Sequence, residues 1–141
     1  MNRYVLDTSA LLTLIENEEG REEIEILLRQ ALKEEIELCI AVVRSIEVFY
    51  ISWREQGEKV AHERLKLIES LPVMQEELTD KLIKIIGEIR ATTKMSFADS
   101  CICGLAKHKE AILVHKDPEF EQVEADIKQY KLPYKPKLRS I

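Results

Sequence analysis

The chain has 141 residues, a length typical of one domain with one hydrophobic core, so we expect residues 1–141 to form a single domain. Its net charge of −5 argues against a protein that coats nucleic acid through bulk electrostatics, and no apolar run reaches the roughly 18 residues of a membrane span. The cysteines are three, an odd number, and the N-terminal residues lack a secretory signal, so we expect a reduced, cytoplasmic protein with these cysteines in its core.

The first half of the chain alternates short apolar runs with one-faced amphipathic segments. In chain order, this alternation predicts a strand over residues 3–6, helices over 10–15 and 24–32, a buried strand over 36–40, a central helix over 42–53 and an amphipathic helix over 59–69.

The second half continues the alternation. It predicts a short strand over 72–74, helices over 77–90 and 96–107, a strand over 111–114, a short helix over 118–124 and a last strand over 127–130. Alternating elements of this kind indicate an α/β fold in which a central parallel sheet is covered by helices on both faces.

The C-terminal segment, about residues 127–141, has a charge opposite to that of the rest of the chain. From Ile127 onward there are five basic residues and no acid. The segment is either a solvated chain end or a contact for a phosphate backbone, and the sequence leaves both interpretations open.

Four acidic residues, Asp7, Glu47, Asp99 and Asp117, stand beside apolar runs. A carboxylate next to a buried segment is costly unless it is paired, hydrogen-bonded or metal-bound. Asp7 and Asp117 follow predicted strands, and ligands of open α/β sheets gather outside the carboxyl ends of the strands. We therefore expect the four acids to share one site.

Each acid also has a purely structural explanation. These explanations are helix N-caps for Asp7 and for Asp117, which precedes Pro118, a capping box that joins Ser96 to Asp99, and an ion pair of Glu47 with Arg44 one helical turn earlier.

At these acids the sequence resembles the PIN-domain nucleases, most closely the small VapC-type toxins of toxin–antitoxin pairs and their archaeal relatives. The stretch YVLDTSALL is similar to the family's first strand, with Asp7 as a metal ligand and Ser9 as the following hydroxyl. SIEVFY is similar to the helix that carries Glu47, and SFADSCICGLAKHKEAILVHKDPEF to the segment with Asp99 and Asp117. Glu119 stands at a position that is often acidic.

The resemblance implies a PIN-like three-layer α/β/α sandwich, cleavage of RNA by an endoribonuclease, a homodimer, and an antitoxin protein as a partner. Asp7, Glu47, Asp99 and Asp117 would be the catalytic and metal-binding residues. His115 departs from the pattern because a threonine or serine is common at its position. It is expected either to bond a carboxylate or to be an ordinary, partly exposed histidine.

The predicted ligand set selects the metal. Carboxylates without nearby histidine or cysteine ligands favour Mg²⁺ or Mn²⁺ over zinc, and such an ion activates water at a scissile phosphate. Without the ion the acids would repel one another, so neutralising one is expected to leave the metal-free protein as stable or more stable. Ser9, Lys94 and Lys116 are the predicted substrate-binding residues, and a solvated side chain is the alternative for both lysines.

Three functions fit the sequence before its structure is considered. The first, which we favour, is a metal-dependent ribonuclease that acts as a toxin or in RNA processing. The second is a catalytically weak PIN-fold binding protein, and the third is a phospho-acceptor receiver domain. The predicted helix over 42–53 has more large apolar side chains than one core-facing surface can bury, so Tyr50 or Trp53 is expected at the interface of the dimer.

Overall fold

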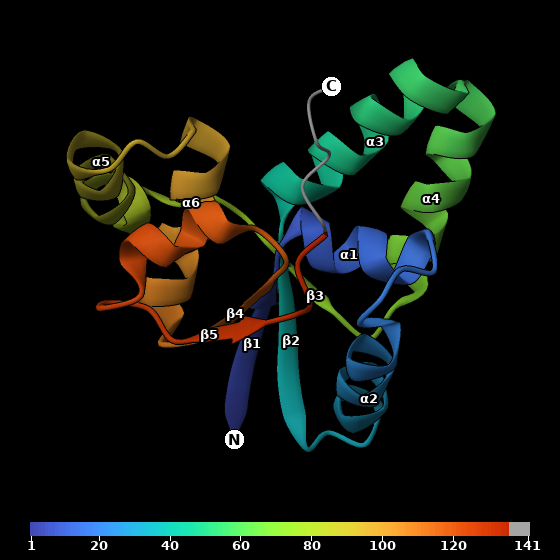
Figure 1. The fold of residues 1–141 in the computed structure, drawn as a ribbon, viewed down its shortest axis with the longest axis horizontal. Coiled ribbons are helices and arrows are strands. Elements are labelled where there is room, and N and C mark those ends of the chain that lie inside the picture. Colours follow the sequence, from blue (N-terminus) through green and yellow to red (C-terminus); the bar gives the residue numbers. More distant parts are fainter. Residues whose placement is uncertain (136–141) are drawn as a thin grey trace.

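The computed structural model describes residues 1–135, which form a five-stranded parallel sheet with helices on both faces (Figure 1). In sheet order the strands are β3 (Met74–Glu76), β2 (Ile36–Ala41), β1 (Asn2–Leu6), β4 (Ile112–His115) and β5 (Gln129–Lys131). The predicted α/β class, with a central parallel sheet between two helical layers, is confirmed.

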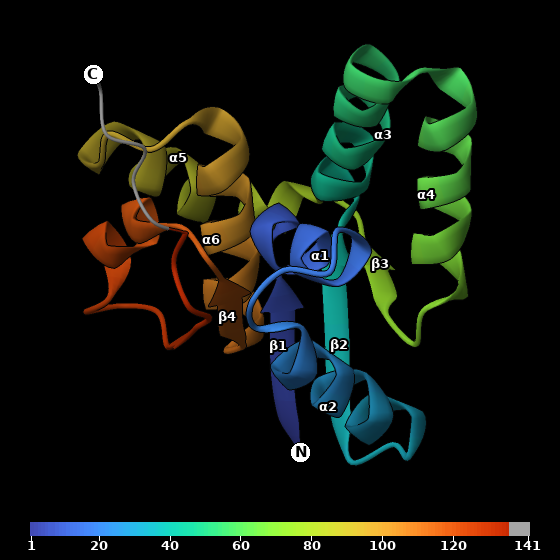
Figure 2. The ribbon, with the colours of Figure 1, turned by 45° about the vertical axis from the view of Figure 1, so that its right-hand side comes forward.

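The helices follow in chain order. They are α1 (Thr8–Ile15), α2 (Arg21–Leu32), α3 (Val42–Gln56), α4 (Glu58–Ser70), the 3₁₀ helix η1 (Asp80–Leu82), α5 (Ile83–Thr92), α6 (Phe97–Lys109) and the 3₁₀ helix η2 (Pro118–Val123). Helices α1 and α2 lie on one face of the sheet and α5 and α6 on the other, while α3 and α4 form a hairpin that extends past the carboxyl ends of the strands (Figure 2). Within the described residues, no helix combines the length and apolar character needed to cross a membrane.

Alternation along the strands builds a separate core on each face of the sheet. In β1, Val5 packs with α5 and α6, whereas the next residue, Leu6, packs with α1 and α2. In β4, Leu113 and Val114 divide between the two cores in the same way. This alternation of side chains follows from the two-residue repeat of a strand, and it buries the central strands on both sides.

The order of the strands places a switch point beside β1. The chain runs from β1 to β2 and β3 on one side, and then crosses to β4 and β5 on the other. Receiver domains have the order 2-1-3-4-5, so the receiver interpretation is wrong. The crevice outside the carboxyl ends of β1 and β4 is the expected place for a ligand.

The predicted strand over residues 72–74 is displaced towards the C-terminus. Pro72 has no N–H to donate, and the N–H of Val73 donates to the Leu71 carbonyl at 2.8 Å, which closes a turn. Pairing with β2 therefore begins only at Met74, opposite Cys39.

The predicted helix over 77–90 begins too early and ends too early. Glu76 still pairs with Ala41, and Thr79 remains extended, so helical structure starts at Asp80 as η1 and continues as α5. The last strand starts at Gln129 rather than at Ile127, because the Ile127 N–H closes a turn with the Val123 carbonyl. The remaining predicted helices and strands are confirmed with small shifts of their ends.

Candidate metal centre

The four predicted acids lie at the carboxyl edge of the sheet. Asp7 directly follows β1, Asp117 precedes η2 just after β4, Glu47 lies on α3, and Asp99 lies in the first turn of α6. They form two groups that share Asp99, one around a buried arginine and one around a pair of acids after β4.

Arg44 is the centre of the first group. Its Nη2 lies 2.7 Å from Asp7 Oδ1, and its guanidinium also forms ion pairs with Glu47 and Asp99. Arg44 and Asp7 are each only 4% exposed. Burial alone would lower the pKa of Arg44, but the carboxylates of Asp7, Asp99 and Glu47 outweigh burial and raise it. The predicted pair of Arg44 with Glu47 is confirmed, within a larger cluster of charges.

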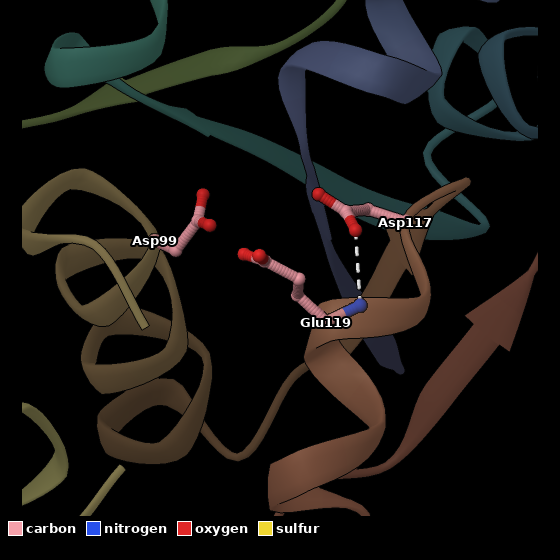
Figure 3. A group of neighbouring side chains, drawn as sticks. All are labelled: Asp99, Asp117 and Glu119. Carbon is pink, nitrogen blue, oxygen red and sulfur yellow. Dashed lines mark hydrogen bonds between the residues drawn. The ribbon is translucent and has the colours of Figure 1, made fainter. Parts of the chain in front are cut away.

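Asp99, Asp117 and Glu119 form the second group. Each offers one carboxylate oxygen, and these oxygens all lie within 4.8 Å of one another. Figure 3 shows the Glu119 side chain reaching towards Asp99, with Asp117 beside them. The nearby Asp117 carboxylate is the main cause of a raised pKa at Glu119, as expected where like charges gather without a cation.

The structural roles of the acids are observed as well. Asp7 Oδ2 accepts from the N–H of Ser9 at 3.2 Å and so caps α1, while Asp117 Oδ1 accepts from the N–H of Glu119 at 2.9 Å and caps η2. Ser96 caps α6 by accepting from the N–H of Asp99 at 3.1 Å, but the Asp99 carboxylate contacts Arg44 instead of completing a capping box. These caps hold the backbone at Asp7, Asp99 and Asp117 in place beside the site.

Ser9, a predicted substrate-binding residue, links β1 to β4. Its hydroxyl donates to Asp7 Oδ2 at 2.6 Å and accepts from the N–H of Lys116 at 2.9 Å. The Lys116 side chain is buried, and its Nζ lies 2.6 Å from the Glu19 carbonyl oxygen and 3.6 Å from Glu18 Oε1. Contact of Lys116 with RNA remains a prediction, and it would require the loss of these contacts.

His115 matches neither of the environments expected from the sequence. It is fully buried, its Nδ1 accepts from the N–H of Asp117 at 3.0 Å, and its Nε2 lies 2.7 Å from Gln129 Oε1. Since Nδ1 accepts, the proton is on Nε2 and the ring is neutral. Burial lowers the pKa of His115 and favours this state. The ring holds the backbone of Asp117 in place and bonds no carboxylate.

The remaining basic candidates lie at the surface. Lys94 is exposed just before α6, which fits both a solvated lysine and an RNA contact, so its role stays a prediction. In the C-terminal segment, Lys131 forms ion pairs with two acids of η2 and the following turn, and Lys135 pairs with Glu18. Lys137 and Arg139 lie outside the described residues. Where it is described, the basic segment therefore contacts the acidic body of the same chain.

The second group suits a hard divalent cation. Oxygens bound to Mg²⁺ at about 2.1 Å lie at most about 4.2 Å apart, so small side-chain rotations would let Asp99, Asp117 and Glu119 share one ion. Asp7 Oδ1 is also buried and accepts no well-aligned hydrogen bond, although it lies beside Arg44.

All three cysteines are buried free thiols, as predicted, and burial raises the pKa of Cys39 to about 11 and that of Cys103 to about 12.

Sequence reasoning missed two parts of the site. Arg44 was expected only as a partner of Glu47, because its contacts with Asp7 and Asp99 depend on the tertiary fold. Gln129, which bonds His115, gave no local signal either. The signal available for Arg44 was a charged residue in the first turn of the predicted central helix, directly after Val42 and Val43.

A family model described as PIN domain matches residues 4–126. No curated protein matches the chain at a significant level.

Solved structures share the fold across almost the whole chain. A chain of VapBC2 from Rickettsia felis, solved with a DNA fragment of its promoter, has a TM-score of 0.77 at 16% identity and covers 93% of this chain and 99% of its own. A chain of DNA-bound VapBC from Salmonella typhimurium has a TM-score of 0.73 at 20% identity, with coverages of 93% and 98%. The sarcin-ricin loop cleaving toxin VapC20 of Mycobacterium tuberculosis has a TM-score of 0.64 at 17% identity, with coverages of 85% and 94%.

Proposed function

The chain belongs to the PIN-domain family, and from this membership we propose that it is a Mg²⁺- or Mn²⁺-dependent endoribonuclease that hydrolyses phosphodiester bonds of RNA. One observation carries the proposal: Asp99, Asp117 and Glu119 hold carboxylate oxygens within 4.8 Å of one another at the ligand-binding edge of the sheet.

In this proposal the residues of the site have distinct tasks. Asp99, Asp117 and Glu119 would hold the cation, which, when bound, would lower the pKa of a water and balance charge at the phosphate. Glu119 is the most exposed of the three, and the proton of the attacking water is proposed to pass to the Glu119 carboxylate oxygen that does not bind the cation. Asp7 and Glu47, the other two predicted ligands, face Arg44.

The cellular role we propose is that of the toxin in a toxin–antitoxin pair, acting as a homodimer in the cytoplasm. The likeness to chains of VapBC complexes supports the fold that this role needs, and the three free thiols suit a reducing compartment. One sheet with a core on each face supports a single domain. RNA is proposed to contact Lys94, beside α6, and Ser9 and Lys116 after opening of their present contacts.

The alternative is a catalytically weak PIN-fold protein that serves mainly in binding. A specific observation favours it, since Arg44 already balances part of the charge of Asp7, Glu47 and Asp99. We favour the enzyme because Arg44 forms no ion pair with Asp117 or Glu119, so the charges of these two acids are left for a cation.

Metal removal and one matched pair of substitutions test the proposed function. We expect purified protein to cleave RNA with Mg²⁺ or Mn²⁺, to stop in EDTA, and to recover poorly with Ca²⁺, whose coordination is larger and looser. Asp99→Asn should abolish cleavage, whereas Asp126→Asn, at an exposed aspartate outside the site, should not change it. Cleavage that persists in excess EDTA, or full activity of Asp99→Asn, would exclude the proposal.

The toxin role has a test of its own. A small reading frame directly upstream, encoding a DNA-binding segment followed by a helical tail, is expected, and its product should bind this protein and suppress its cleavage of RNA. Cleavage that is unaffected by that product would argue for a role in RNA processing instead.

A further inference from the structure

Arg44 occupies a position that a cation would otherwise fill. It lies in the first turn of α3, and its guanidinium contacts three carboxylates that come from three different elements, those of Asp7, Glu47 and Asp99. No other basic side chain of residues 1–135 forms an ion pair with these three acids.

The contacts of Arg44 keep it in this place. An arginine does not lose its proton in a protein, so a guanidinium that is 4% exposed must keep anionic partners. Its Nε is buried without a hydrogen-bond partner, so the carboxylates at Nη1 and Nη2 supply its compensation. Moving Arg44 out would leave Asp7, which is equally buried, without a counter-charge.

The five acids of the edge are therefore divided. Asp7 and Glu47 face Arg44, Asp117 and Glu119 face each other, and Asp99 is shared between the two groups. A divalent ion placed between Asp7, Glu47 and Asp99 would lie beside a full positive charge in a poorly solvated site, which is strongly unfavourable. An ion at Asp99, Asp117 and Glu119 meets three acids, of which only Asp99 is engaged by Arg44.

We infer that Arg44 is a resident cation that takes the place of a metal ion between Asp7, Glu47 and Asp99, so that this chain binds a single divalent ion, at Asp99, Asp117 and Glu119. The inference rests on the proposed function only for the presence of a divalent ion. It changes the roles of Asp7 and Glu47, which hold Arg44 and not the metal.

The test is binding of Mn²⁺, measured by calorimetry and by the electron paramagnetic resonance of free Mn²⁺. The unmodified protein should bind one Mn²⁺ per chain. Asp117→Asn and Glu119→Gln should weaken binding by about tenfold or more, as loss of a ligand does, whereas Glu47→Gln should weaken it by less than about threefold. Arg44→Gln should bind two Mn²⁺ per chain, and Arg44→Lys, which keeps the charge, should bind one.

Several results would overturn the inference. These are two Mn²⁺ per unmodified chain, no Mn²⁺ bound at all, an effect of Glu47→Gln as large as that of Asp117→Asn, or one Mn²⁺ in a folded Arg44→Gln protein. If Arg44→Gln does not give the circular dichroism of a folded protein, the stoichiometry of the unmodified chain and the comparison of Glu47→Gln with Asp117→Asn still decide. One bound Mn²⁺ without RNA cleavage would defeat the proposed function alone, and cleavage with two ions would defeat this inference alone.

Discussion

Asp7 and Asp117 each serve a helix and the site at the same time. An aspartate has two oxygens, and in Asp7 one accepts from Ser9 while the other lies beside Arg44. In Asp117 one oxygen caps η2, and the residue also contributes to the cluster with Asp99 and Glu119. The capping explanation and the functional one are therefore compatible, because the cap uses one carboxylate oxygen to hold the backbone and leaves the other oxygen for a second contact.

A first prediction concerns the sign of two charge removals in the metal-free protein. Asp7→Asn should destabilise by about 1–3 kcal/mol, because it removes a partner of buried Arg44 while Glu47 and Asp99 remain. Glu119→Gln should be neutral or stabilising, because it removes repulsion from Asp117. The result expected for Asp7→Asn is the opposite of the one predicted from the sequence, where neutralising any acid was expected to relieve repulsion. That prediction did not include the ion pairs with Arg44. Urea unfolding in EDTA measures both variants.

The pH dependence of stability provides a control for the prediction on Glu119→Gln. The folded pKa of Glu119 is raised above 4.5, so the folded chain takes up this proton before the unfolded chain does. The repulsion between Glu119 and Asp117 is present at pH 7 and is relieved as the pH falls through the raised pKa of Glu119. The difference in the free energy of unfolding between Glu119→Gln and the unmodified protein should therefore shrink as the pH falls. A stabilising Asp7→Asn, or a strongly destabilising Glu119→Gln, would contradict our account of the charges.

At the scale of elements, a glycine sets how closely α5 and α6 approach. A Cβ built on Gly104 in α6 would lie 2.5 Å from Ile86 Cγ1, whereas one built on Gly87 in α5 would meet nothing within 4 Å. Gly104→Ala should therefore lower the free energy of unfolding by about 1–3 kcal/mol through overpacking. Gly87→Ala should be neutral or stabilising by up to about 1 kcal/mol, because alanine favours a helix interior.

Chemical denaturation of the two alanine variants is a matched comparison, since the same methyl group is added to neighbouring helices. Equal stabilities would show that Ile86 moves aside without cost. The two substitutions also separate packing from chemistry, because neither glycine belongs to the acid groups.

The elements show what local sequence determines. Helices with a sustained apolar face, such as α2, and strands with buried runs, such as β2, were predictable because their signal lies within a few residues. The segment from Pro72 to Asp80 was not, because its strand is short and exposed and its start depends on which residue can pair with Cys39. For the site, the edge positions of Asp7 and Asp117 followed from strand ends, but the joining of Arg44 to Asp7 and Asp99 required the tertiary structure.

At the scale of the whole molecule, an apolar stripe remains exposed on the projecting α3–α4 hairpin. Ile46, Tyr50 and Trp53 follow one another by four and three residues along α3 and are exposed, so they form one face of the helix. Phe49 packs edge-on against Trp53 and His62, which holds the indole in place. A second exposed apolar surface, around Phe97 and Ile83, lies at α5 and α6.

The last prediction assigns the homodimer interface to the stripe of Ile46, Tyr50 and Trp53. Light scattering at micromolar concentration should report about twice the 16.4 kDa of one chain. Trp53→Glu should shift the protein towards monomer, because a charge would be buried in the contact, and Phe97→Glu, at a residue 64% exposed on the other surface, should leave the dimer intact. A monomeric unmodified protein would refute the dimer, and dissociation by Phe97→Glu but not by Trp53→Glu would move the interface to α5 and α6.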